Sequence, residues 1–72
     1  MNEVQEIDIV TEYITLGQLL KFARLVGGGG EAKVLLATET VKVNGENENR
    51  RGRKLRDGDV IEVRGKAYRI KR

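Results

Sequence analysis

Four consecutive glycines, Gly27 to Gly30, constrain the fold of this chain more than any other feature of its sequence. A glycine run disfavours helix continuation, and glycine readily adopts the left-handed conformation that ends a helix. We therefore expect the run to end one helix and a second, short helix to follow over Glu31–Thr38. Eight residues do not make a stable isolated helix, so the two helices must pack as a helix-loop-helix unit.

The first helix has two independent start signals. Thr15 and Gln18 have the spacing of a capping box, in which each side chain accepts a hydrogen bond from the other residue's backbone. Ile14 and Leu19 are placed for a hydrophobic staple. The apolar spacing predicts a buried face, and we expect Phe22 to belong to the core as well. The predicted buried face consists of Leu16, Leu19, Leu20, Ala23 and Val26.

Beyond Thr40 the pattern changes to short strands and turns. Val41–Val43 alternates and runs into Asn44-Gly45, a strong hairpin signal. Further strands are expected over residues 60–63 and 67–70, and a short edge strand over residues 7–14. Two short helices packed against a small sheet of three to five strands make an α+β fold, predicted to be one domain over residues 1–72.

Composition excludes much of enzyme chemistry. The 72 residues include no Cys and no His, so there is no thiol nucleophile and no imidazole base. A chain this short buries a marginal core, and no carboxylate pair is framed by a nucleophile or an acid–base partner. We expect no catalysis, no metal and no cofactor. The acidic start lacks a signal-peptide pattern and no apolar stretch reaches the roughly 20 residues of a spanning helix, so we expect a cytoplasmic protein.

The net charge of +3 hides a strong asymmetry. Residues 50–72 hold ten basic and three acidic side chains, and residues 50–56 alone hold five cations. Such a block repels itself unless a polyanion or nearby carboxylates offset it, and Asp57 and Asp59 are the close candidates in sequence. The sequence favours phosphate binding over a solvated loop. The glycine run allows two interpretations, a plain connection or a backbone contact to a nucleic-acid phosphate.

Aromatic side chains are few. Tyr13, Phe22 and Tyr68 are the only ones, whereas modules that stack bases need a platform of exposed rings. The sequence therefore predicts that any nucleic acid is recognised by backbone shape and charge rather than by base stacking.

The helix-loop-helix unit, the stretch Val41-Lys42-Val43-Asn44-Gly45 and the stretch Leu55-Arg56-Asp57-Gly58-Asp59-Val60-Ile61 follow one another in this order. The combination resembles the S4-type (S-four) RNA-binding domain, or alpha-L motif, over residues 14–63. It is most similar to a stand-alone bacterial subgroup, the YaaA- and YbcJ-like small proteins. Gly29 replaces an arginine that the family has in the loop, and Thr15-Leu16-Gly17 replaces a frequent Arg-Leu-Asp.

The resemblance implies a non-catalytic protein that binds RNA along its two-helix face and the loop after the Val-Asn-Gly strand. The expected partner is structured ribosomal RNA or a ribosomal particle, with a role in ribosome assembly or translation. The charges indicate the same surface, since Arg suits bidentate and Lys point-charge contacts with phosphate. The predicted RNA-binding residues are Lys21, Arg24, Lys33, Lys42, Arg50, Arg51, Arg53, Lys54 and Arg56.

Two alternatives remain open. A protein-interaction adaptor would dock an acidic partner through the same Arg-rich block. A ubiquitin-like carrier shares Val-Asn-Gly-Glu and a late Asp-Gly-Asp turn, but its chemistry needs a C-terminal Gly-Gly, and the chain ends Ile70-Lys71-Arg72. No membrane partner and no small-molecule substrate are expected.

Overall fold

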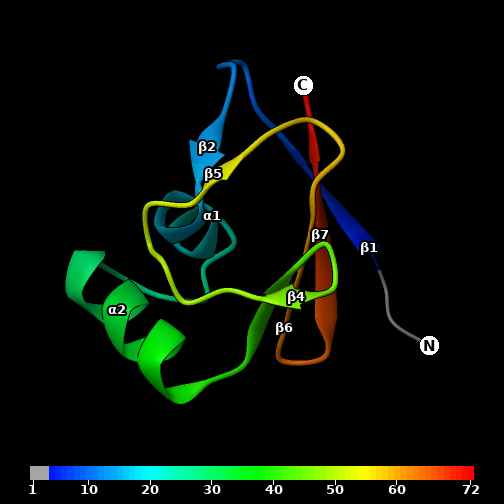
Figure 1. Cartoon of the computed structure of the whole chain (residues 1–72). Coiled ribbons are helices and arrows are strands. Elements are labelled where there is room, and N and C mark those ends of the chain that lie inside the picture. The colour runs from blue at the N-terminus through cyan, green and yellow to red at the C-terminus, as the bar shows by residue number, and fades with distance from the viewer. Residues whose placement is uncertain (1–3) are drawn as a thin grey trace.

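The computed structural model describes residues 4–72, and at Gly29 only the helix to which it belongs. A five-stranded sheet lies on one side of two helices, and a two-stranded sheet lies beside the first helix (Figure 1). The helices are α1 (Leu16–Phe22) and α2 (Gly29–Thr38). The small sheet pairs β2 (Ile14–Thr15) with β5 (Lys54–Leu55) in antiparallel orientation. The predicted α+β fold is confirmed.

The large sheet is mixed. Its spatial order is β1 (Val4–Asp8), β7 (Lys66–Lys71), β6 (Val60–Val63), β3 (Val41–Val43) and β4 (Glu46–Asn47). β1 runs parallel to β7 and forms one edge, while all other neighbours are antiparallel. The Asn44-Gly45 hairpin is confirmed, since both residues have positive φ, 52° and 85°, as a two-residue hairpin turn requires.

The prediction of a single strand over residues 7–14 is wrong. β1 ends at Asp8 and β2 begins at Ile14, so the chain changes sheets between them. Ile7 is buried opposite Ile70, whereas Val10 is 94% exposed. The large sheet offers one apolar face, and the irregular apolar spacing after Ile7 marks the point where the chain leaves it and crosses to α1.

The core lies between one face of the large sheet and the two helices. Strand residues that alternate along β3, β6 and β7 contribute to it, together with leucines from both helices and Leu55 of β5. The intervening strand residues point to the opposite, outer face of the sheet. Outer-face side chains include Lys42, Glu62 and Arg69.

Phe22 does not belong to this core, contrary to the prediction. It is 61% exposed, while Leu16, Leu19 and Leu20 are fully buried. At 3.6 residues per turn, Phe22 lies about 110° around α1 from the centre of that buried face. Its side chain therefore points away from the sheet.

The glycine run does not end the first helix. α1 ends at Phe22 in a Schellman motif, in which the Leu25 N–H donates to the Leu20 carbonyl (2.9 Å) and the Arg24 N–H to the Lys21 carbonyl (3.0 Å). Arg24 takes the left-handed position, with φ of 61°, although glycine is more usual there. A continued helix would point Leu25 away from the core, whereas the turn packs it against the core.

This early turn changes two further expectations. The helical spacing of Gln18, Lys21 and Arg24 predicts that these residues share one face of the first helix, but Arg24 lies beyond the end of α1. The second helix begins at Gly29, two residues before the predicted start, with Gly28 as its N-cap.

Candidate nucleic-acid interface

The Arg-rich segment, here called the arginine loop (residues 48–56), lies across the start of α1 (Figure 1). The first backbone amides of a helix have no partner within the helix. In α1 the Leu16 N–H donates to the Arg53 carbonyl (2.8 Å) and the Gly17 N–H to the Arg51 carbonyl (2.9 Å). The predicted capping box is confirmed as well, with Thr15 and Gln18 bonded in both directions. The loop is thereby fixed to the helix.

Gly17 allows the arginine loop to approach α1 closely. A Cβ atom at this position would lie 2.5 Å from Cγ of Arg51 and 3.4 Å from its carbonyl oxygen. Any larger residue would force Arg51 to move. The glycine that replaces the frequent Asp of the resembled motif therefore has a structural role, because it sets the position of the Arg51 side chain.

Glu48 holds the shape of the arginine loop from inside. Its carboxylate accepts hydrogen bonds from Nε and Nη2 of Arg50 (both 3.0 Å) and from Nη1 of Arg53 (2.9 Å). The backbone N–H groups of Asn49 and Arg50 also donate to it. Only 8% of its side chain is exposed. Hydrogen bonds from the Arg50 side chain lower the pKa of Glu48 to about 2, against the opposing effect of burial.

Glu48 is the carboxylate that sequence reasoning missed. Asp57 and Asp59, the candidates chosen there, have other partners among the described residues. Asp57 accepts from the Arg72 N–H (2.9 Å), and Asp59 from the Arg56 N–H (2.8 Å) and the Asn44 amide (3.0 Å). The signal was present in the sequence, because Glu48 lies two and five residues before Arg50 and Arg53, on the other side of the block.

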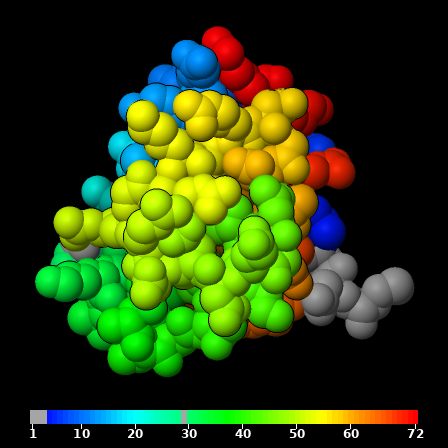
Figure 2. Space-filling model, viewed as in Figure 1, coloured from blue at the N-terminus to red at the C-terminus, as the bar shows by residue number. Residues whose placement is uncertain are grey.

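Three neighbouring hollows surround the arginine loop and α1. The first, of about 300 Å³, lies among α1, the start of α2 and the loop, and Lys21 and Arg51 line it. The second, of about 420 Å³, is lined by loop residues, among them Lys54 and Arg56. The third, of about 460 Å³, includes Tyr13, Lys21 and Phe22. Figure 2 shows residues 48–58, in yellow, across the middle of the face beside α2.

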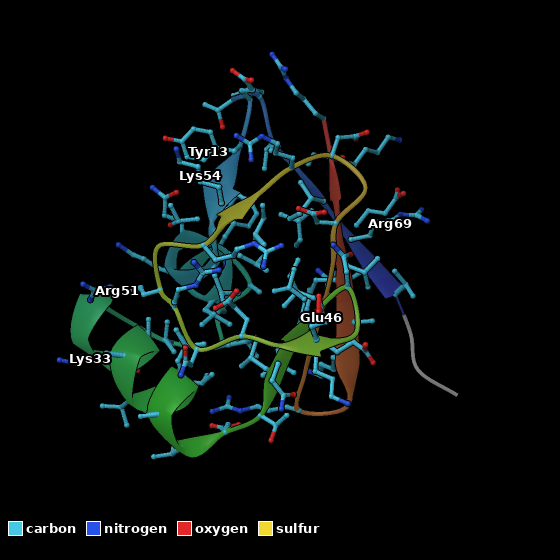
Figure 3. The ribbon with its side chains drawn as sticks, in the orientation of Figure 1. Tyr13, Lys33, Glu46, Arg51, Lys54 and Arg69 are labelled. Carbon is cyan, nitrogen blue, oxygen red and sulfur yellow. The ribbon has the colours of Figure 1, made fainter. Side chains whose placement is uncertain are left out.

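The hollows form one continuous surface, which we call the basic track. Gly52 lines both the first and the second hollow, and Gln18 and Lys21 line both the first and the third. Nζ of Lys54 lies 4.9 Å from the centroid of the Tyr13 ring, and Cζ of Arg56 lies 5.7 Å from it, which joins the second hollow to the third (Figure 3). None of the described residues that line these hollows is a carboxylate.

The structure brings six of the nine predicted residues to the basic track. They are Lys21, Arg50, Arg51, Arg53, Lys54 and Arg56. Arg24 and Lys33 do not line the hollows, and Lys33, on α2, extends to the same side of the view as Arg51 in Figure 3. Lys42 lies on the outer face of the sheet, opposite Glu62. Phe22 and Tyr13 belong to the track although sequence reasoning left them out.

A carboxylate of the protein itself binds a backbone amide of the glycine run. Glu31 accepts a hydrogen bond from the Gly27 N–H (3.0 Å), so a negative group already lies at the start of α2. This contact favours the connecting interpretation of the run over a phosphate contact at Gly27. Gly28 nevertheless lines the first hollow of the basic track.

Comparison with known proteins bears on the family of the chain. The family model of the S4 domain matches residues 7–71. A protein of Bacillus subtilis (strain 168) named "Probable ribosome maturation protein RlbA" is 56% identical over 59 residues, which cover 82% of this chain and 83% of that protein. Within residues 4–72, no helix has the length and apolar character needed to cross a membrane.

Proposed function

The chain belongs to the S4 domain family, and we propose that it is a non-catalytic protein that binds structured RNA in a ribosome-related role. Ribosomal RNA, free or within a ribosomal particle, is the proposed partner. The relative from Bacillus subtilis is named for ribosome maturation, and we carry that role to this chain as part of the proposal. Such a role places the protein in the cytoplasm.

The observation that carries the proposal is the charge of the basic track. Cations line all three hollows, and no carboxylate lines any of them in the described part of the chain. A phosphate backbone is the ligand that such a surface attracts most strongly, because each contact releases condensed counterions. Arg51 and Lys21 would hold phosphates at the first hollow, and Lys54 and Arg56 at the second.

The arginine loop is also held in shape before any RNA binds. Its carbonyls are bonded to α1, and Glu48 fixes Arg50 and Arg53. Binding to a preformed loop avoids much of the entropy that ordering a mobile loop would cost. Arg50 and Arg53 thus support the track, while Lys21, Arg51, Lys54 and Arg56 are the proposed principal contacts.

The test is the salt dependence of affinity for a labelled fragment of structured ribosomal RNA. If about five phosphates are neutralised, the logarithm of affinity should fall against the logarithm of salt concentration with a slope of about −4 to −5. A nearly flat dependence would contradict the proposal.

The adaptor alternative has its own outcome in a second assay. Retention of the tagged protein on purified ribosomal particles should be lost after ribonuclease treatment if RNA is the partner. Retention that survives the treatment would favour docking to an acidic protein.

A further inference from the structure

Two exposed aromatic rings line the third hollow of the basic track. Phe22 is 61% exposed and Tyr13 is 39% exposed, and both contribute to its wall. Burying a phenylalanine side chain stabilises a fold, and the exposed position of Phe22 on α1 forgoes most of that stabilisation. Packing in the core therefore does not explain the presence of an aromatic side chain at position 22.

The polar groups around these rings are those that suit a nucleotide. Lys21 and Gln18 line the same hollow, and Lys54 and Arg56 lie over the Tyr13 ring. Oε1 of Gln18 accepts from the Thr15 N–H (2.9 Å), so its NH₂ is the group left to donate. An apolar protein partner would leave these cations to be desolvated, whereas a nucleobase is flat, apolar on its faces and attached to a phosphate.

We propose that the third hollow binds one unpaired nucleobase of the RNA, stacked on Phe22, with the adjoining phosphate at Lys21. Tyr13, held by Lys54 and Arg56, forms the second aromatic wall. The inference rests on the proposed function and adds base recognition to the phosphate contacts. It also revises the expectation that the protein recognises nucleic acid by charge and shape alone, which followed from the small number of aromatic side chains.

The experiment compares three RNA hairpins of the same stem: one with a single bulged adenosine, one with an abasic nucleotide in the bulge, and one fully paired. Stacking of one base on an aromatic side chain is worth about 1–3 kcal/mol, so the full-length protein should bind the bulged hairpin roughly 5- to 150-fold more tightly than the abasic one. Phe22→Leu keeps an apolar side chain without a ring face, and should bring the two affinities to within about twofold. Phe22→Tyr should restore the preference.

Val34 offers a matched control, because it is equally exposed at 61% but lies on α2, outside the third hollow. Val34→Ala should leave the preference for the bulged hairpin unchanged. A spectroscopic readout comes from Phe22→Trp, which introduces the only tryptophan of the chain. Its fluorescence should be quenched by the bulged hairpin and not by the abasic one.

The outcomes separate this inference from the function on which it rests. If the protein binds all three hairpins equally and Lys21→Gln weakens all of them, the base site is refuted and RNA binding stands. If no hairpin or ribosomal RNA fragment binds, the proposed function itself fails. If Phe22→Leu retains the base preference but loses binding to ribosomal particles, the hollow docks a protein and the inference is overturned.

Discussion

Cationic side chains on the outer face of the sheet and on the basic track differ in their acidic neighbours. On the outer face of the sheet, Lys42 lies opposite Glu62 and Arg69 donates to Glu6 (2.6 Å). The hydrogen bond from Arg69 lowers the pKa of Glu6, as expected for an ion pair. On the basic track, by contrast, no lining residue of the described chain is acidic, and Glu48, which pairs with Arg50 and Arg53, does not line any of the three hollows. Figure 3 shows Arg69 on the opposite side of the ribbon from Arg51.

We propose that the placement of carboxylates marks the binding face better than the density of cations does. The densest cationic block contains Arg50 and Arg53, yet both are tied to Glu48. Lys21, which stands alone in sequence, lines two of the three hollows. The distribution of charge along the sequence therefore locates the basic region. The fold determines which of its cationic residues line the basic track.

Removal of equal charge from each face should affect RNA binding unequally. Lys21→Gln combined with Arg51→Gln should weaken binding to a ribosomal RNA fragment roughly 10- to 100-fold, because two charge-assisted phosphate contacts are lost. The salt slope should become shallower by about two. Fluorescence anisotropy at several salt concentrations measures both quantities.

The matched control for that pair is Lys42→Gln combined with Arg69→Gln, which removes the same charge from the outer face of the sheet. Its affinity should stay within about threefold of the wild type. Equal losses from the two pairs would show that only net charge matters, and the distinction between the faces would be lost.

The next largest effect concerns the support of the arginine loop. Glu48→Gln leaves Arg50 and Arg53 without their carboxylate, so the free energy of unfolding should fall by about 1–3 kcal/mol. Urea denaturation measures it. Glu62→Gln on the outer face is the control, and a half-buried cross-strand charge that makes no close ion pair with the described residues should contribute less than about 1 kcal/mol.

Acid provides a second readout of the same residue. The pKa of Glu48 is about 2 in the folded protein and close to 4.5 when unfolded, so the unfolded state takes up the proton first. The stabilisation is complete above pH about 4.5 and is lost as the pH falls toward about 2. Over that window the wild type should lose more stability than Glu48→Gln. Parallel acid curves for the two proteins would refute the internal role of Glu48.

The smallest predicted effect compares two helical glycines. Gly30→Ala meets no atom within 4 Å and should stabilise the protein by up to about 1 kcal/mol through helix propensity. Gly17→Ala should lack that gain and should weaken RNA binding, because its Cβ displaces Arg51. Thermal denaturation and anisotropy distinguish them. A stabilised Gly17→Ala protein with full affinity would mean that the close approach of the loop is unimportant.

Local signals in the sequence predicted much of the fold. The Thr15 capping box, the Asn44-Gly45 hairpin and the alternation of β3 depend on neighbouring residues, and the structure confirms each of them. The motif resemblance likewise predicted the family correctly. These features need no knowledge of which surfaces meet in three dimensions.

The remaining features depend on tertiary contacts. The buried face of α1 is narrow and consists of Leu16, Leu19 and Leu20. Phe22 would be buried only if a wider part of the helix surface packed against the core. Arg24 takes a left-handed conformation because the resulting turn packs Leu25 on the core. The residues next to Arg24 in the sequence do not predict this conformation. The partnership of Glu48 with Arg53 arises from the path of the arginine loop over α1.

Backbone amide chemical shifts, followed during titration with a ribosomal RNA fragment, would show whether RNA lies along the basic track. We expect the largest changes at Gln18, Lys21 and Gly52, with little change at Lys42, Glu62 and Arg69 on the outer face of the sheet. Largest changes on the outer face, with the amides of the basic track unmoved, would contradict this expectation.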